Sequence, residues 1–256
     1  MAHKKSLQAK LASALITVLS VFVFQALAAA QWPAPPPRPP VPQRAARLQY
    51  ISGEVSVAPI ATNQWTAARL YQTLPPSEYI WTAKDARAEI SVGYGVFRMS
   101  SEASVTLLAV NRSTVQIGVN QGEVSLTILH LFPGEIYEID TPNATLTATK
   151  AGVYRVDVHP NEDQTVVTVR KGALAATGNG SAVTVKSDEQ VFFRGGKSLQ
   201  HTVQKAPPKD GFEDWASVRD QRMKANRPPF VVGVGPYPYG VVAVPAPPPP
   251  PPPYYR

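Results

Sequence analysis

The sequence predicts an all-β fold: a layered β-roll, solenoid-like or sandwich domain of many short strands, plus one C-terminal helix and disordered proline-rich arms. Three observations lead to this prediction. Apolar and polar residues alternate with period two from Arg47 to about Val203, turn-forming residues recur between the alternating segments, and most of the 27 prolines lie outside that stretch. We therefore expect a β domain over residues 47–203.

The alternation is clearest in segments 86–92, 123–130 and 153–158. Every second side chain there is apolar, which is typical of a strand with one dry face and one wet face. The apolar faces carry Ala88, Ile90 and Val92; Val124, Leu126 and Ile128; and Tyr154, Val156 and Val158. The opposite faces carry Glu89 and Ser91; Glu123, Ser125 and Thr127; and Arg155 and Asp157.

A β-hairpin is the clearest local unit. GVYRVDV and TVVTVRKG are two alternating segments, and the polar run HPNEDQ between them predicts a turn. The segments 52–59, 121–128 and 170–177 each place Gly before a short alternating run, and this weak recurrence fits stacked turns in a roll or solenoid.

One helix is expected within residues 204–227. Asp210 followed by Glu213 resembles a capping box, and apolar residues follow at helical spacing: Phe212, Trp215, Val218 and Met223. We expect these apolar side chains to cover a patch on the sheet or on a partner.

Residues 1–30 are typical of an export signal. Lys4 and Lys5 precede a charge-free apolar run that ends in small residues, and Ala28 and Ala30 fit the small-x-small rule for cleavage. The alternative is an uncleaved signal anchor, because about 20 apolar residues just span a bilayer. Both alternatives place the β domain outside the cytoplasm, in the periplasm or cell envelope.

Proline-rich arms flank the β domain at residues 31–46 and 228–256. Proline has no backbone N–H and a fixed φ, so we expect extended polyproline II segments that act as spacers or dock to an aromatic groove or cell-wall polymer. Most of the net +7 charge comes from the flanks, because residues 1–46 and 228–256 hold six basic residues and no acidic one. The nearly neutral domain argues against nucleic acid as a partner.

No catalytic, cofactor or metal site is predicted. The chain has no Cys, which excludes thiolate chemistry and sulfur-based metal sites, and it carries no recognised nucleotide-binding or hydrolase motif. Asp157, His159, Glu162 and Asp163 cluster along the hairpin, but Pro and Asn beside acidic residues are ordinary turn chemistry.

The segments YISGEVSV, EIYEIDTPNATLTATKAGVYRVDV and TVVTVRKGALAAT resemble, in order and spacing, the FecR domain. That resemblance covers about residues 47–202 and implies the all-β extracytoplasmic module of the ferric citrate regulator and of many exported proteins. Such regulators carry an anti-sigma segment before their membrane helix, whereas ten residues precede the apolar run here. The resemblance therefore implies an envelope module detached from sigma-factor control.

We thus expect a non-enzymatic interaction or structural module of the cell envelope whose partner is an envelope protein or a cell-wall polymer. The alternatives are a polysaccharide- or peptidoglycan-binding protein and a membrane-anchored signalling accessory with an uncleaved N-terminal helix. Large aromatic side chains mark interaction surfaces when they are exposed. The candidates are Trp65, Tyr79, Trp81, Tyr94, Phe97 and Trp215.

Overall fold

The structure is a computed structural model that describes residues 45–178, 181–195, 200–225, 232–234 and 241–243. All of them lie within the compact unit Gln43–Arg256. The expected signal peptide with its cleavage positions Ala28 and Ala30, the proline-rich linker and most of the tail lie outside the described residues.

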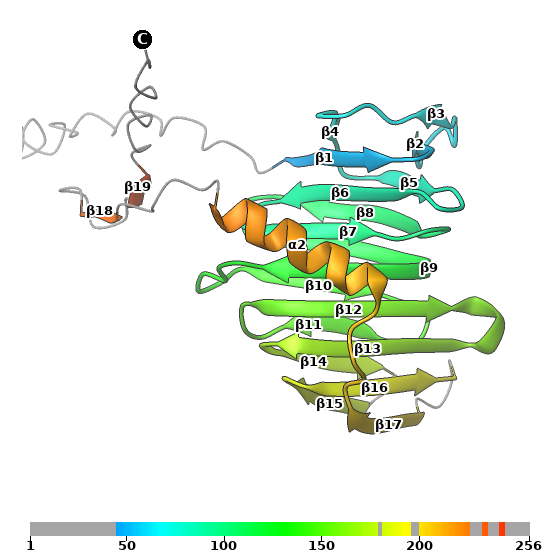
Figure 1. Ribbon diagram of the computed structural model, residues 1–256, viewed down its shortest axis with the longest axis vertical. Coiled ribbons are helices and arrows are strands. Elements are labelled where there is room, and N and C mark those ends of the chain that lie inside the picture. Colours follow the sequence, from blue (N-terminus) through cyan, green and yellow to red (C-terminus); the bar gives the residue numbers. More distant parts are fainter. Residues whose placement is uncertain (1–44, 179–180, 196–199, 226–231, 235–240, 244–256) are drawn as a thin grey trace, which may run out of the picture. The chain divides into compact units, whose positions relative to one another are not determined.

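Two sheets, here called A and B, form the domain (Figure 1). Sheet A consists, in spatial order, of β4 (Thr73–Leu74), β1 (Ala46–Ser52), β6 (Arg87–Val92), β7 (Gly95–Met99), the second half of β9 (Thr114–Ile128), β12 (Gly152–His159), β13 (Gln164–Lys171), β16 (Glu189–Arg194) and β17 (Gln200–Lys205). Sheet B consists of β3 (Thr66–Ala67), β2 (Val55–Pro59), β5 (Glu78–Thr82), β8 (Ser104–Val110), the first half of β9, β10 (Ile136–Asp140), β11 (Thr145–Ala148), β14 (Ala173–Gly178) and β15 (Ser181–Lys186).

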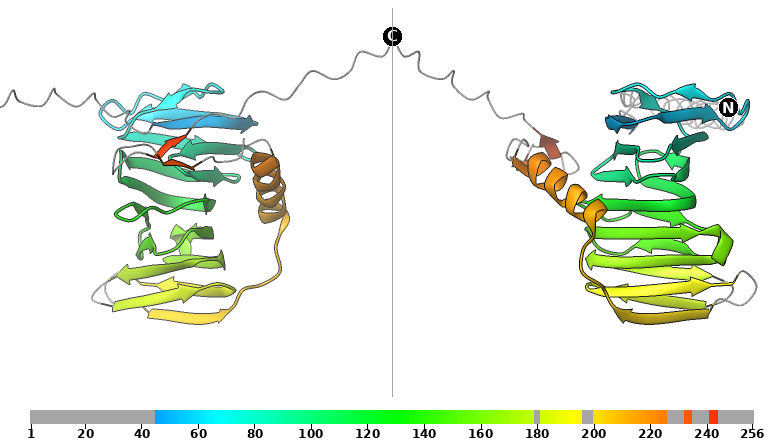
Figure 2. Two further views of the ribbon diagram at one scale, coloured as in Figure 1. Left: turned by 90° about the vertical axis from the view of Figure 1, so that its left-hand side faces the viewer. Right: turned by 45° about the vertical axis from the view of Figure 1, so that its right-hand side comes forward.

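The chain winds back and forth between the sheets as it descends the stack. The hairpin β12–β13 belongs to sheet A, β14–β15 to sheet B and β16–β17 to sheet A again. From β5 onward, the order of strands in space therefore follows the sequence (Figures 1 and 2). Strands β9 and β10 pair in parallel, and the other pairings of the two sheets are antiparallel. The predicted all-β, layered fold of short strands is confirmed, and so is the hairpin over 152–171.

Strand β9 connects the two sheets by crossing from one to the other at Gly122. Residues up to Gln121 pair within sheet B, whereas Gly122 already pairs with Val158 of sheet A. Gly122 has φ +87°, and a Cβ there would lie 2.6 Å from Cα of Ala103. Glycine is the residue that tolerates both the backbone conformation and this close approach.

The core lies between the sheets and is built from the apolar faces that the alternation predicted. Val124, Leu126 and Ile128 of β9 are buried beside Tyr154 and Val156 of β12 in a single cluster. Close packing of both inner faces gives one continuous hydrophobic layer.

The outer face of sheet A differs from expectation. Helix α2 (Gly211–Ala225) covers it (Figure 2), so that Glu89, Ser125 and Thr127, expected on a wet face, are buried. Further described elements are the 3-10 turn Pro160–Glu162 and the paired strands β18 (Val232–Val234) and β19 (Val241–Ala243).

Candidate functional site

Helix α2 begins where the sequence predicts a cap. Oδ1 of Asp210 accepts hydrogen bonds from the backbone N–H groups of Phe212 and Glu213, each at 3.0 Å. These bonds satisfy two of the free donors at the start of a helix. The carboxylate of Glu213, expected to complete a capping box, binds the guanidinium of Arg170 instead.

The buried face of α2 is more polar than predicted. Its buried residues are Phe212, Glu213, Ala216 and Asp220. Val218, expected to cover the sheet, is 45% exposed. Two of the four buried side chains are carboxylates, so the helix docks on charges as well as on apolar contacts.

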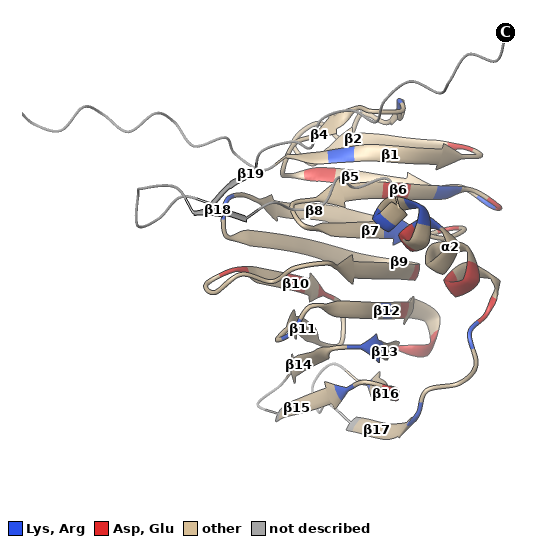
Figure 3. Cartoon of the chain, turned by 60° about the vertical axis from the view of Figure 1, so that its left-hand side comes forward, with Lys and Arg blue, Asp and Glu red and all other residues tan. Residues whose placement is uncertain are grey.

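A row of polar side chains crosses sheet A beneath and beyond α2. Strand register places one outward-facing residue of each neighbouring strand opposite the next: Glu89, Arg98, Ser125, Arg155, Thr168, Gln190 and Gln204. Opposite residues on one face lie close enough for their side chains to interact. The row therefore brings charged groups from β6, β7 and β12 under one helix (Figure 3).

Arg98 is the centre of the first cluster and is 0% exposed. Its guanidinium donates to Glu89 at 2.8 Å, to Asp220 at 2.7 Å and to Oγ1 of Thr127 at 3.2 Å. Arg219 of α2 donates to both carboxylate oxygens of Glu89, at 2.8 and 2.9 Å. Burial opposes ionisation of Glu89, but the bonds from Arg219 and Arg98 outweigh it and lower its pKa.

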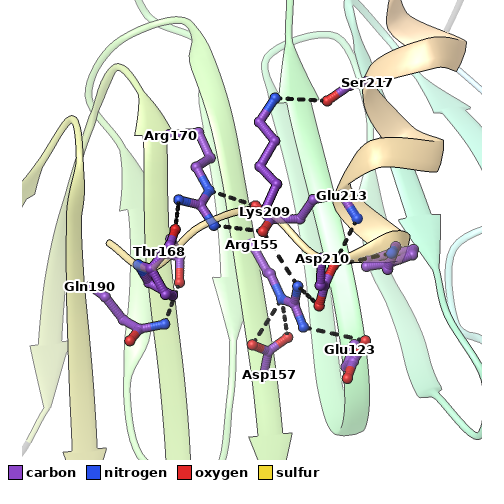
Figure 4. Close-up of polar contacts among 12 residues, drawn as sticks. Glu123, Arg155, Asp157, Thr168, Arg170, Gln190, Lys209, Asp210, Glu213 and Ser217 are labelled. Atoms are coloured by element: carbon purple, nitrogen blue, oxygen red, sulfur yellow. Dashed lines mark hydrogen bonds and ion pairs between the residues drawn. The ribbon is translucent and has the colours of Figure 1, made fainter. Parts of the chain in front are cut away.

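Arg155 is the centre of the second cluster, at the start of α2 (Figure 4). It pairs with Asp157 at 2.8 Å, with Glu123 at 3.3 Å and with Asp210, and Arg170 pairs with Glu213 at 2.6 Å. Burial raises the pKa of Asp157 to about 6, because the attraction of Arg155 only partly offsets the desolvation of the carboxylate.

The pH dependence of stability follows from that pKa. The folded state holds the proton of Asp157 more tightly than the unfolded state, so this contribution is complete below about pH 4 and is lost as the pH rises through about 6. The full difference corresponds to about 3 kcal/mol.

Urea unfolding at successive pH values measures how the free energy of unfolding falls as the pH rises. Asp157→Asn should make this fall smaller, while its side-chain oxygen still accepts a hydrogen bond from Arg155. Glu162→Gln, in the turn of the same hairpin, is the matched control, and parallel curves for Asp157→Asn and wild type would contradict the assignment.

An aromatic group packs α2 against β1. Trp215 packs against Tyr50 of β1, with ring centroids 5.6 Å apart, and Arg219 lies 4.1 Å from the centroid of the Tyr50 ring. The guanidinium carbon of Arg87 lies 5.1 Å from the centroid of the Trp215 ring. The predicted surface residue Trp215 thus helps to hold the helix on sheet A.

The structure separates the other predicted surface residues. Trp65 is 47% exposed and stacks on the half-buried Tyr79, with centroids 6.2 Å apart. Trp81 is half-buried on β5, and Tyr94 is half-buried beside Phe132 in the turn after β6. The expectation for Phe97 is wrong: its side chain is 1% exposed, because it points inward from β7 into the core.

The sequence analysis did not single out three exposed apolar residues that lie near Trp65 in the sequence. Ile60, Leu70 and Tyr71 are 38–56% exposed and lie with Trp65 in segment 60–71, around β3 at one end of the stack (Figure 1). The sequence feature that could have identified them is the presence of large apolar residues in a segment without period-two alternation.

The charged groups at α2 are arranged to hold the helix. Every carboxylate of the two clusters pairs with an arginine, and among the described residues no group of three metal-ligating side chains is present. Of the hairpin acids, Asp157 is bound by Arg155, and Asp163 accepts from Asn143 at 2.9 Å. No helix in the described ranges is long and apolar enough to span a bilayer.

A comparison with protein families decides the kind of domain. Residues 78–175 match the family described as FecR protein, from the first residue of β5 into β14. This chain contains a FecR domain. The remaining strands of the two sheets extend the FecR domain at both ends of the match, and α2 covers its sheet A.

Two solved structures resemble the FecR-containing chain, each described as a "putative anti-sigma factor" from Parabacteroides distasonis. One has 12% identity and a TM-score of 0.44 over 50% of this chain, and this chain spans 59% of its length, which is less than two thirds. The other has 11% identity and a TM-score of 0.46 over 59% of this chain and 76% of its own. No curated protein matches the sequence.

Proposed function

We propose that this FecR-domain chain is a non-enzymatic interaction module of the bacterial cell envelope that binds an envelope protein. The FecR domain supports a regulatory or structural role, because the resemblance implies an extracytoplasmic module. The α2 interface supports a non-enzymatic role too, because its carboxylates and guanidinium groups form ion pairs with one another that hold the helix on sheet A.

The exposed apolar residues of segment 60–71 carry this proposal. Ile60, Trp65, Leu70 and Tyr71 are exposed, whereas the core cluster of the domain holds large apolar side chains such as Leu126 and Phe193. These four residues follow one another along one short segment at the end of the stack (Figure 1). Exposed apolar residues can mark a binding surface, and Trp and Tyr contribute most strongly to protein interfaces. We therefore place the partner on segment 60–71.

Site-specific photo-crosslinking in living cells tests this placement. A crosslinker at Trp65 should give one discrete adduct with an envelope protein, and a crosslinker at Leu108, an apolar residue of β8 that is 38% exposed, should not. Trp65→Ser should weaken recovery of the same partner while lowering the free energy of unfolding by no more than about 1.5 kcal/mol, since it removes one stacked aromatic pair. The same adducts from both positions would contradict the placement.

A second candidate function is binding of polysaccharide or peptidoglycan. The stacked Trp65–Tyr79 pair favours it, because it offers an exposed aromatic face with little conformational freedom. Purified protein should then pellet with cell-wall sacculi, and Trp65→Ser should stay in solution. Crosslinking without pelleting supports the protein partner instead.

Export completes the proposal, and the sequence of residues 1–30 supports it. N-terminal sequencing of protein from the envelope fraction should find a chain that starts after Ala28 or Ala30. A chain that still starts near Met1 would favour the membrane-anchored alternative.

A further inference from the structure

A cleft of about 390 Å³ runs along the flank of α2 that faces β13. Its walls come from β12, β13, the turn before β16, the segment that leads into α2, and α2 itself. Ser217, Gln221 and Lys224 share one face of the helix at the i, i+4 and i+7 positions and line the cleft together. The volume falls within the range of small-molecule sites.

The charges that line this cleft do not balance. Of its acidic residues, Asp220 is bound by Arg98, and of its basic residues, Arg170 is bound by Glu213. What remains is Lys171, Lys209 and Lys224 against the single carboxylate of Asp188. None of these three lysines forms an ion pair with any described residue.

One of the three ammonium groups is held in place. Nζ of Lys209 donates to Oγ of Ser217 at 2.9 Å, across the gap between the incoming segment and α2 (Figure 4). This bond uses one of the three donors of the ammonium group and leaves two for a ligand. A positioned cation, a hydroxyl and an amide therefore line one wall together.

We propose that this cleft binds a phosphate group. A phosphate monoester carries a charge between about −1.5 and −2 at neutral pH, which matches the local excess of three lysines over one carboxylate. Lysine binds phosphate as a point charge, and Ser217 and Gln221 supply neutral donors to the remaining oxygens. The rest of the domain is nearly neutral, so the excess is local to the cleft.

Titration of the full chain with inorganic phosphate, followed by amide NMR, tests the proposal. Saturable shifts are expected at Ser217, Gln221 and Lys224. Lys171→Gln and Lys224→Gln should each weaken binding about fivefold to tenfold, because each removes a charge-assisted contact. Lys84→Gln, an exposed lysine in the turn after β5, is the matched control and should leave the affinity unchanged.

Vesicles distinguish the two sources of the phosphate. If phosphatidylcholine vesicles that contain phosphatidic acid bind the chain and inorganic phosphate competes, the ligand is a lipid headgroup. If inorganic phosphate binds and such vesicles do not, the ligand is a soluble phosphorylated compound. Absence of saturable phosphate binding, or equal weakening by Lys84→Gln, would overturn the proposal.

Discussion

Replacing Arg98 by methionine should lower the free energy of unfolding by about 3–5 kcal/mol, the range found when one partner of a buried ion pair is removed. Methionine fills most of the space but leaves Asp220 without its guanidinium and Glu89 with Arg219 alone. Urea unfolding of the full chain measures the loss. We also expect α2 to separate from sheet A at lower urea concentration than the core unfolds.

Two variants make this prediction specific. Arg112→Met, in the exposed turn between β8 and β9, removes a guanidinium that has no buried partner and should change stability by no more than about 0.5 kcal/mol. Adding Asp220→Leu to Arg98→Met should recover at least about 1 kcal/mol, because the buried carboxylate disappears too. A loss in Arg98→Met no larger than in Arg112→Met would show that the buried pairs contribute nothing.

Gly122→Val should destabilise the domain by about 3 kcal/mol or more. Valine would have to adopt φ +87° and place its Cβ within 2.6 Å of the Ala103 backbone, at the point where β9 passes from sheet B to sheet A. A positive φ alone costs about 1–2 kcal/mol, and the backbone contact requires the crossing itself to move. Thermal unfolding measures the combined cost.

Gly134→Val separates the two contributions. Gly134 has φ +82°, but a Cβ there meets no atom within 4 Å. Gly134→Val therefore measures the cost of the positive φ without a steric clash. We expect it to lose about 1–2 kcal/mol. Equal losses at positions 122 and 134 would mean that the approach to Ala103 does not constrain the crossing of β9.

The sequence predicts well what depends on neighbouring residues. Period-two alternation assigns Val124, Leu126 and Tyr154 to the core because a strand turns every second side chain to the same face. The cap at Asp210 is likewise local, since the bonds reach only two and three residues along the chain.

Contacts between distant segments could not be predicted in this way. Arg98 and Asp220 are separated by 122 positions, and nothing in EISVGYGVFRM indicates that a helix will cover its polar face. Glu89 was therefore expected to face solvent. Phe97 was a surface candidate because large aromatic side chains mark interaction surfaces when they are exposed. Among the candidate surface residues, Trp65 is distinguished by its exposed side chain. The sequence alone could not show this, because the exposure of Trp65 depends on how segment 60–71 packs.

Native-state hydrogen exchange along α2 addresses most directly whether the helix is part of the folded FecR-containing domain. If paired charges lock it to sheet A, amides of residues 216–224 should open with a free energy within about 1 kcal/mol of those in β7 and β12, and Arg98→Met should lower the α2 values first. If these amides exchange at rates close to those of an unstructured peptide while the strands stay protected, the claim that paired charges hold α2 on sheet A is contradicted.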